Sequence, residues 1–401
     1  MSKTNKLSQI VFLSTEIGRG HPNYLDSIFR LIEKECSKKK VVSPFLNVFD
    51  QSKGLSKTGW NLVKRLYFLG GKGGLATKFY NFFRGKKKGL SKDSIFLKIL
   101  GQNIKRSFEK FKGVCLVAHP LTATILSEVC RVWYLHGEIA APQECAIKGV
   151  EKIFVPLKET KDKLVTFGAD PETIVITGLL IEPEALENAK DSFSQRVERV
   201  KSKKNLTIGF FTSGAYPPRH IEKIILGTKS VIQKNMRAII FLGANQRKYK
   251  KIEDEVKKLN IKFVEDEKDD LIENKNWELL LIKEKDRISE TKRAIELIPY
   301  LDAFVSAPHE RTNWAVGLGL PFFALFPLIG TFAPQNFEFA QKNGVVYPLK
   351  TKDDSKKLGD IILKLRDENK LLEMTKNGFG KYEINGAQKV ASLLIQEMQK
   401  I

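Results

Sequence analysis

Residues 10–32 read IVFLSTEIGRGHPNYLDSIFRLI and hold two hydrophobic patterns in succession. Residues 10–13 form an uninterrupted apolar run, as a buried parallel strand requires. After it, apolar side chains recur at helical spacing, at Tyr24, Leu25, Ile28, Leu31 and Ile32. Residues 14–21 lie between these patterns and include two glycines. A strand, a glycine-containing turn and a helix form the opening unit of a parallel α/β domain.

The same alternation of strands and helical segments continues along the chain. In the first half we predict further strands at residues 41–49, 114–118, 131–135, 152–155 and 173–177. A polar, helix-like stretch at 184–205 follows, and strands restart at 206–211, 237–242, 303–306 and 321–326. Charges of both signs alternate over 265–290, which we expect to be mostly solvated surface. The pattern predicts an α/β protein of two Rossmann-like domains facing across a cleft.

Positive charge dominates the composition. The 401 residues include 68 Lys and Arg against 46 Asp and Glu, a formal net charge of +22. Such an excess indicates an anionic partner, which could be nucleic acid, an anionic membrane or a phosphorylated substrate. No apolar run reaches the roughly 18 residues of a spanning helix, and residues 1–13 suggest no signal peptide. The four cysteines lack metal-like spacing and fit a reducing compartment. Together with the positive charge, this predicts a cytoplasmic protein, peripheral on the inner face of the membrane.

Residues 51–112 concentrate this charge, with 16 Lys and Arg against Asp93 and Glu109, and they also hold ten aromatic residues. Apolar wedges flanked by cations are typical of an interfacial amphipathic segment. The residues expected to meet a membrane or acceptor are Trp60, Phe82, Phe83, Arg84, Lys86, Lys87 and Lys88. Basic and aromatic residues together can also bind single-stranded nucleic acid. The pairing of adjacent aromatics beside leucines makes nucleic acid the unlikely partner, and a solvated basic insertion remains a further alternative.

Histidines gather at the predicted strand ends. Ligands of open α/β sheets bind beyond the carboxyl ends of the strands. Four of the five histidines lie there, at His21, His119, His136 and His309. Any one of them could be a packing or capping histidine, but their common position predicts a functional edge. The turn at 18–21 lacks the glycine patterns of dinucleotide-binding and P-loop proteins, so we expect neither kind of site.

Several short motifs resemble one group of enzymes. The loop at 14–21 resembles the Gly-Gly-His loop of two families, the monogalactosyldiacylglycerol synthase and processive diacylglycerol glucosyltransferase family and the peptidoglycan N-acetylglucosaminyltransferases. Residues 118–121 are similar to the His-Pro-Leu motif of the diacylglycerol enzymes, and 168–178 to the segment that closes their N-terminal domain. Residues 242–245 and 319–336 resemble the nucleotide-binding half. Because these matches follow in order, the sequence resembles that of a GT-B glycosyltransferase.

This resemblance implies transfer of a sugar from a nucleotide-sugar donor, expected to be a UDP-sugar, to a lipid or lipid-linked acceptor at the membrane surface. His21 would be the general base, with Glu138 as the other candidate, and His119 and His136 would lie on the acceptor side. The expected donor-binding residues are Gly18, Gly20, Ser213, Gly214, Asn245, His309, Arg311, Thr312, Asn313, Gln335 and Asn336. No metal ion and no cofactor is expected.

The restart of the strand and helix pattern at residue 206 predicts how the chain is divided. Residues 1–190 would form the acceptor domain, with the basic and aromatic insertion at 51–112. Residues 205–350 would form the nucleotide-sugar domain, and residues 351–401 would be helices that pack back across the domains.

The sequence departs from the family at the expected ribose site. Trp314 stands where the family has the glutamate that holds the donor ribose, and 308–313 replace a glycine-rich turn. Trp314 could stack on a ligand ring or pack in the core. The departures leave open a GT-B-shaped pseudoenzyme that binds anionic lipid or glycan without turnover.

Overall fold

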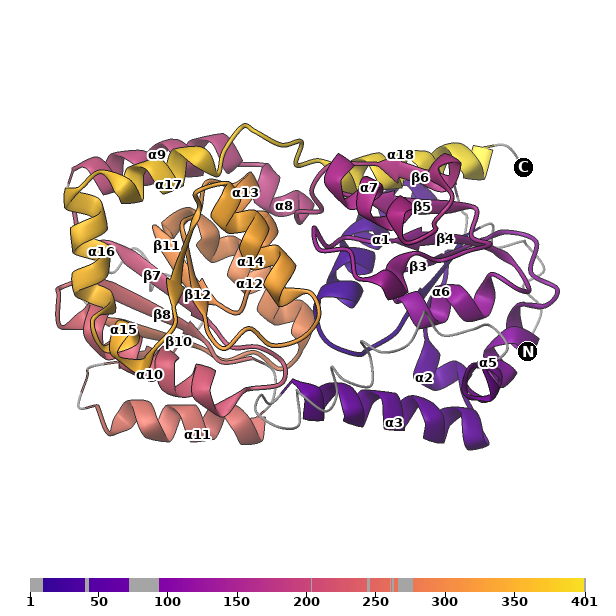
Figure 1. Ribbon diagram of the computed structural model, residues 1–401, viewed down its shortest axis with the longest axis horizontal. Helices are drawn as coiled ribbons and strands as arrows, with labels where there is room; N and C mark the ends of the chain where they lie inside the picture. The colour runs from indigo at the N-terminus through magenta and orange to yellow at the C-terminus, as the bar shows by residue number, and fades with distance from the viewer. Residues whose placement is uncertain are drawn as a thin grey trace. The chain divides into compact units, whose positions relative to one another are not determined.

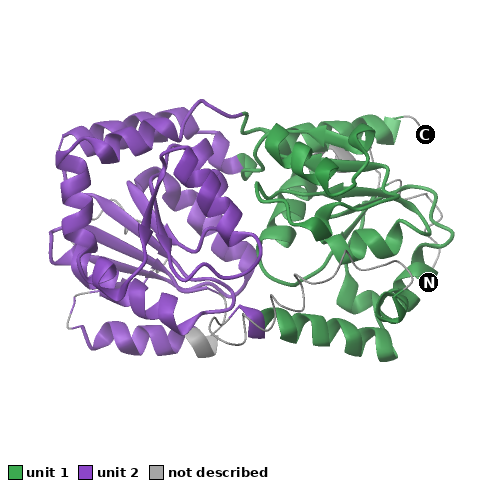
Figure 2. Ribbon diagram, in the orientation of Figure 1, with its two compact units in different colours: residues 1–68, 79–183, 383–401 green, residues 69–78, 184–382 purple. Residues whose placement is uncertain are grey.

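The chain forms two compact units, each built around its own sheet. The computed structural model describes residues 10–39, 43–71, 94–202, 204–243, 246–259, 261, 263–265 and 277–399. Unit 1 comprises residues 1–68, 79–183 and 383–401, and unit 2 comprises 69–78 and 184–382 (Figure 2). The C-terminal region is therefore shared, since residues up to 382 belong to unit 2 and the last helix belongs to unit 1.

Unit 1 contains a parallel sheet in the order β2-β1-β3-β4-β5-β6. Its strands are β1 (Ile10–Ser14), β2 (Phe45–Asn47), β3 (Val114–Val117), β4 (Arg131–Leu135), β5 (Lys152–Val155) and β6 (Ile174–Ile176). Its helices are α1 (Gly20–Lys39), α2 (Val48–Gln51), α3 (Gly54–Gly70), α5 (Ile95–Phe108), α6 (Pro120–Leu126), α7 (Lys158–Thr166) and α18 (Gly386–Gln399). Helices α1 and α18 lie side by side (Figure 1), where Ile28 and Leu394 share one buried cluster.

Unit 2 contains a second parallel sheet, in the order β13-β12-β11-β7-β8-β10-β9. Its strands are β7 (Thr207–Phe211), β8 (Arg237–Phe241), β9 (Phe263–Glu265), β10 (Leu279–Ile282), β11 (Ala303–Ser306), β12 (Phe322–Leu325) and β13 (Val346–Leu349). Its helices are α9 (Ala189–Lys201), α10 (Pro218–Ile232), α11 (Gln246–Lys257), α12 (Arg287–Leu297), α13 (Thr312–Gly317), α14 (Ala333–Lys342), α15 (Lys352–Lys356), α16 (Leu358–Asp367) and α17 (Lys370–Asn377), while α8 (Pro183–Leu186) begins at the unit boundary. Two separate parallel sheets confirm the predicted α/β class.

The stretch expected between the halves is largely an integral helix of unit 2. Arg196 of α9 is fully buried, and its guanidinium donates to the carbonyl oxygens of Leu301 at 2.7 Å and Leu318 at 2.8 Å. Burial lowers the Arg196 pKa to about 10. Because a buried guanidinium is costly unless its N–H groups are bonded, these contacts fix α9 against the sheet.

Two expectations about individual strands need correction. Residues 265–290 were expected to be mostly solvated, but β10 lies inside this stretch and is fully buried beside β8. Its four apolar residues are too few to stand out among the charged residues around them. The strand expected over 41–49 is confined to β2, since α2 starts at Val48, where the Asn47 side chain accepts a hydrogen bond from the Phe49 N–H at 2.9 Å.

None of the helices within the described part of the chain is both long and apolar enough to cross a bilayer.

Candidate functional site

The loop from β1 to α1 gathers polar and aromatic groups in unit 1. Gly18 has a φ of +78°, and a Cβ built there would lie 2.6 Å from the Tyr67 hydroxyl of α3. The positive φ favours glycine at this position, and a larger residue would also displace the Tyr67 hydroxyl. The half-buried His21 is the second residue of α1, and its ring lies edge-on to that of His119, with 5.4 Å between the centroids. The loops after β1 and β3 are joined by a hydrogen bond of 2.7 Å between the Thr15 and Thr122 hydroxyls.

Trp60 lies in the interior rather than at the surface where we expected it. Its side chain is fully buried, and the indole Nε1–H donates to the Leu100 carbonyl oxygen at 3.1 Å. Its ring lies 6.4 Å from that of His119, again edge-on. Trp60 thus packs against His119 inside unit 1 and has no surface available for a membrane.

His136 is also an interior residue, although we expected it on the acceptor side. It has no exposed surface, and burial lowers its pKa to about 4. Its Nε2 lies 2.9 Å from the Ala140 carbonyl oxygen, which can only accept, so Nε2 carries the proton. The Tyr134 hydroxyl then donates to Nδ1 at 3.2 Å. With both ring nitrogens engaged, His136 fixes the loop after β4.

Glu138, the other candidate base, is 6 % exposed. It follows Gly137, where any Cβ would overlap the Tyr24 ring of α1. The loop after β4 therefore packs tightly on α1, and the Glu138 side chain is buried in unit 1.

The second cluster lies at the carboxyl edge of the unit 2 sheet. Arg311, in the loop between β11 and α13, is 8 % exposed. Its guanidinium carbon lies 4.4 Å from the Phe211 ring centre and 5.3 Å from that of Trp314, while one Nη lies 3.2 Å from a Glu310 carboxylate oxygen. The Arg311 Nε–H is buried and has no hydrogen-bond partner in the described structure. The aromatic rings thus hold a guanidinium that keeps an unused donor.

Trp314 is a core residue, which settles the alternative that its sequence position left open. It is 4 % exposed and packs edge-on against Phe211 at 5.6 Å and Phe304 at 6.4 Å between ring centres. Phe211 was not singled out from the sequence, and its position as the last residue of β7 was the available signal.

The loops after β11 and β12 meet at this edge. A Cβ at Gly330, where φ is +87°, would lie 3.9 Å from the His309 ring. The buried Asn336 side chain donates to the Pro308 carbonyl oxygen at 3.3 Å. Burial and nearby Arg311 lower the His309 pKa, against the opposing effect of Glu310. The ring is therefore neutral at neutral pH, which leaves Arg311 as the cation of this cluster.

Hydroxyl donors border the same loops. The Thr312 and Thr331 Oγ1 atoms are buried and lack hydrogen-bond partners among the described residues. Ser213 and Gly214 follow β7 and are half-buried, and Thr212 beside them donates to the Phe241 carbonyl oxygen at 3.0 Å. Asn313 is buried in α13, and Gln335 is half-buried in the first turn of α14. Unit 2 thereby brings its predicted donor-binding residues from β7, β11 and β12 to one sheet edge.

Some predicted site residues lie outside the described residues. They are Asn245 of the donor set and Phe82, Phe83, Arg84, Lys86, Lys87 and Lys88 of the membrane set.

Comparison with known proteins identifies the fold. No protein-family model matches the chain, and no curated protein matches it in sequence. The UDP-GlcNAc 2-epimerase of Neisseria meningitidis, solved with UDP-GlcNAc bound, is 13% identical, with a TM-score of 0.56 over 96% of this chain and 99% of that one. S. aureus MnaA, solved with UDP, is 12% identical, with a TM-score of 0.57 over 98% and 97%. Acinetobacter baumannii MurG is 11% identical, with a TM-score of 0.53 over 97% and 99%. Because the likeness extends over both units, the chain has the GT-B fold, built from two Rossmann-like units.

Proposed function

We propose that this protein is a glycosyltransferase that uses a nucleotide-sugar donor, with UDP as the nucleotide, and a lipid or lipid-linked acceptor at a membrane surface. The observation that carries the proposal is the Arg311 cluster of unit 2. It offers a guanidinium held on two aromatic faces and unused donors on Arg311, Thr312 and Thr331. Such groups suit a diphosphate, because charge-assisted hydrogen bonds to phosphate are strong. UDP or UDP-GlcNAc is bound in two of the compared structures, which share this fold.

In the proposed reaction the bond between the sugar C1 and the diphosphate oxygen breaks, and the electron pair leaves with the diphosphate. The Arg311 guanidinium would stabilise that developing charge, as preorganised donors do in other transferases. A new bond forms between C1 and the acceptor oxygen. The proton of that hydroxyl would pass to His21. The His21 ring packs edge-on against the ring of His119.

The membrane part of the proposal rests on α3. Its exposed leucines include Leu55, Leu62 and Leu66, which are 72 %, 49 % and 44 % exposed. These positions are seven and four residues apart and share one helix face. The exposed Arg65 lies beside that face, and the exposed Lys57 lies elsewhere on the same helix. An apolar stripe on a helix that also carries exposed cations suits shallow insertion into an anionic bilayer.

The decisive experiment measures UDP binding by calorimetry. The wild-type chain should bind UDP, and Arg311→Gln should weaken binding by about tenfold or more, since a hydrogen bond to a charged group contributes about 1.5–3 kcal/mol. Arg311→Lys keeps the charge but loses the planar fork, so it should also bind weakly. Lys229→Gln, which removes one positive charge from the exposed end of α10, should bind as wild type.

Product analysis then separates the reactions open to a UDP-sugar protein. Transfer to a lipid acceptor from a UDP-sugar supports the proposal. Epimerised UDP-GlcNAc formed without acceptor would replace it with the reaction named for the N. meningitidis structure. Tight UDP binding with neither product would favour a GT-B-shaped binding protein.

A further inference from the structure

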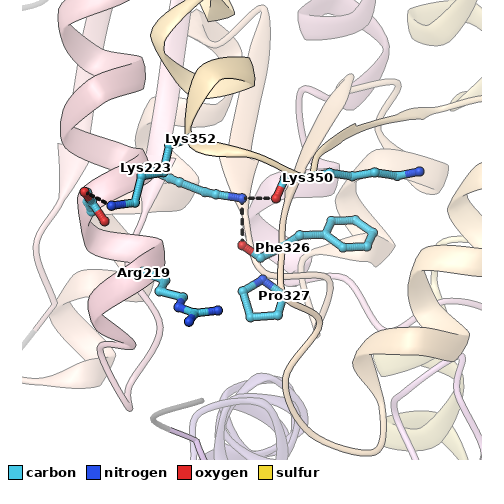
Figure 3. Close-up of a pocket in the computed structure, with 7 residues that line it drawn as sticks. Arg219, Lys223, Phe326, Pro327, Lys350 and Lys352 are labelled. Atoms are coloured by element: carbon cyan, nitrogen blue, oxygen red, sulfur yellow. Dashed lines mark hydrogen bonds and ion pairs between the residues drawn. The ribbon is translucent and has the colours of Figure 1, made fainter. Parts of the chain in front are cut away.

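Unit 2 holds a basic pocket that is separate from the Arg311 cluster. Its volume is about 360 Å³, and it lies where the chain leaves β12 and β13 and enters α10. Phe326 and Pro327 form its apolar side, and Arg219, Lys223, Lys350 and Lys352 bring positive charge to it (Figure 3). Glu222 is the carboxylate that lines it.

One of these cations is part of the pocket wall. The Lys223 ammonium donates to the carbonyl oxygens of Phe326 at 2.8 Å, Leu349 at 2.6 Å and Lys350 at 2.8 Å. Lys223 is 4 % exposed, and burial lowers its pKa. Its three N–H donors are all engaged, so Lys223 fixes the loops after β12 and β13 without being available to a ligand.

The remaining cations are better placed to bind one. Lys352 forms an ion pair with Glu222 at 2.5 Å, which neutralises the carboxylate. Arg219 and Lys350 are exposed, and their side-chain nitrogens form no hydrogen bond or ion pair within the described residues. Figure 3 shows the Arg219 guanidinium near Pro327, while the Lys350 side chain extends past Phe326. Arg219 thus brings an uncompensated positive charge to the apolar side of the pocket, whereas the Lys350 ammonium points away from it in the structure.

We propose that this pocket binds a phosphate group, carried by a small molecule or by a lipid headgroup. Arg219 would bind two phosphate oxygens through its planar fork, and Lys350 would add a point charge after its side chain turns toward the pocket. The volume lies at the low end of the roughly 300–1,000 Å³ range of ligand pockets, so the ligand is small. The site would stand independently of the proposed transferase activity.

The pocket is adjacent to the donor edge through one loop. Phe326 and Pro327 line the pocket, while Gly330 of the same loop lies against His309. The His220 Nε2 donates to the Pro327 carbonyl oxygen at 2.9 Å and anchors the pocket end of this loop. The two binding regions therefore use different side chains, so variants can separate them.

Thermal unfolding of the full chain with inorganic phosphate, at an ionic strength held constant with chloride, tests the site. Phosphate should raise the melting temperature of the wild type and of Lys229→Gln. The double variant Arg219→Gln, Lys350→Gln should shift the apparent phosphate dissociation constant at least fivefold upward. Both substituted side chains are exposed, so the variant should fold, and its melting temperature without phosphate checks this.

Three outcomes bear on the proposal. If the double variant responds to phosphate as the wild type does, the site is refuted. If Arg311→Gln removes the response instead, phosphate binds at the donor edge and the proposal also fails. If Arg311→Gln loses UDP but keeps its phosphate response, the site stands whether or not the protein is a transferase. Repeating the titration with glycerol 1-phosphate and with phosphatidylglycerol vesicles, against phosphatidylcholine, tells a soluble ligand from a headgroup.

Discussion

The carboxyl edges of the two sheets are built alike and carry different chemistry. In unit 1 the loops after β1 and β3 bring together His21 and His119, two imidazoles 5.4 Å apart. In unit 2 the loop after β11 brings Arg311 onto Phe211, the last residue of β7, at 4.4 Å. An imidazole titrates near neutral pH and can move a proton, whereas a guanidinium stays charged and can only hold an anion. The architecture fixes the place of each site, and the loop side chains decide its chemistry.

Replacing His21 should give the largest effect and tests whether unit 1 supplies the proton acceptor. His21→Ala should lower the rate of sugar transfer by about 10²–10⁴, as loss of a general base usually does. UDP affinity should stay within a few-fold, because the groups proposed to hold the diphosphate, Arg311, Thr312 and Thr331, belong to unit 2. Rate measurements at saturating donor, with calorimetry as the control, check both parts. Near-normal turnover would instead point to Glu138.

Each unit also contains a buried histidine, and both histidines should lower the stability of the fold at acid pH. Burial lowers the pKa of His136 in unit 1 and of His220 in unit 2 from 6.5 to about 4. Because the pKa is lower in the folded state, the unfolded state binds the proton first as the pH falls. The free energy of unfolding is therefore highest above about pH 6.5 and decreases as the pH falls toward 4. At pH 5 the loss is on the order of 2 kcal/mol for each histidine.

Urea unfolding at pH 7 and pH 5 measures this loss. His136→Gln keeps a donor for Ala140 and an acceptor for Tyr134 but does not titrate, so the variant should lose less stability between the two pH values. His220→Gln should do the same. A pH dependence equal to that of the wild type in both variants would show that neither histidine is responsible.

The exposed leucines test whether membrane contact belongs to unit 1. Leu62→Ser with Leu66→Ser should weaken binding to anionic vesicles by about tenfold, because each partly inserted leucine contributes a fraction of its roughly 1.5–3 kcal/mol of burial energy. The matched control is Ile288→Ser on α12 of unit 2, a residue that is 53 % exposed. This control should bind as wild type.

Salt separates the two parts of that binding. Raising the salt from 0.1 to 1 M shortens the Debye length from about 10 to 3 Å, which should weaken the attraction of cations such as Lys57 and leave the leucine contribution. Equal binding to neutral and anionic vesicles, or displacement by stoichiometric single-stranded nucleic acid, would contradict the membrane assignment.

Most strands and their ends were readable from the sequence, but β9, β10 and β13 were not predicted, and neither were the surroundings of each side chain. Buried parallel strands are short continuous apolar runs, so Lys152–Val155 was predicted to the residue. His136 and His309 both follow such strands and looked equivalent. In the structure His136 is fully buried with both ring nitrogens hydrogen-bonded, whereas His309 lies beside Gly330 at the sheet edge. Contacts with other parts of the chain make this difference, and the sequence pattern does not show them. Trp60 was misplaced for the same reason, because its partner is the carbonyl of Leu100, 40 residues away.

The smallest expected effect tests how Arg311 is held. Phe211 contributes an aromatic face to the guanidinium at 4.4 Å and packs on Phe241 with 4.2 Å between ring centres. Phe211→Leu keeps an apolar side chain but removes the ring, so Arg311 loses a cation–π contact of about 1 kcal/mol. UDP affinity should fall by about fivefold, while phosphate binding at Arg219 should not change.

Phe241→Leu is the matched control, since it removes a ring from the same stacked pair without taking it from Arg311. It should cost similar stability and leave UDP affinity near that of the wild type. Equal loss of UDP affinity in both variants would mean that the packing of the sheet, rather than the ring beneath Arg311, sets the affinity. The contrast between the two edges would then rest on the guanidinium alone, because the aromatic support that unit 2 gives to Arg311 would have no measurable role in anion binding.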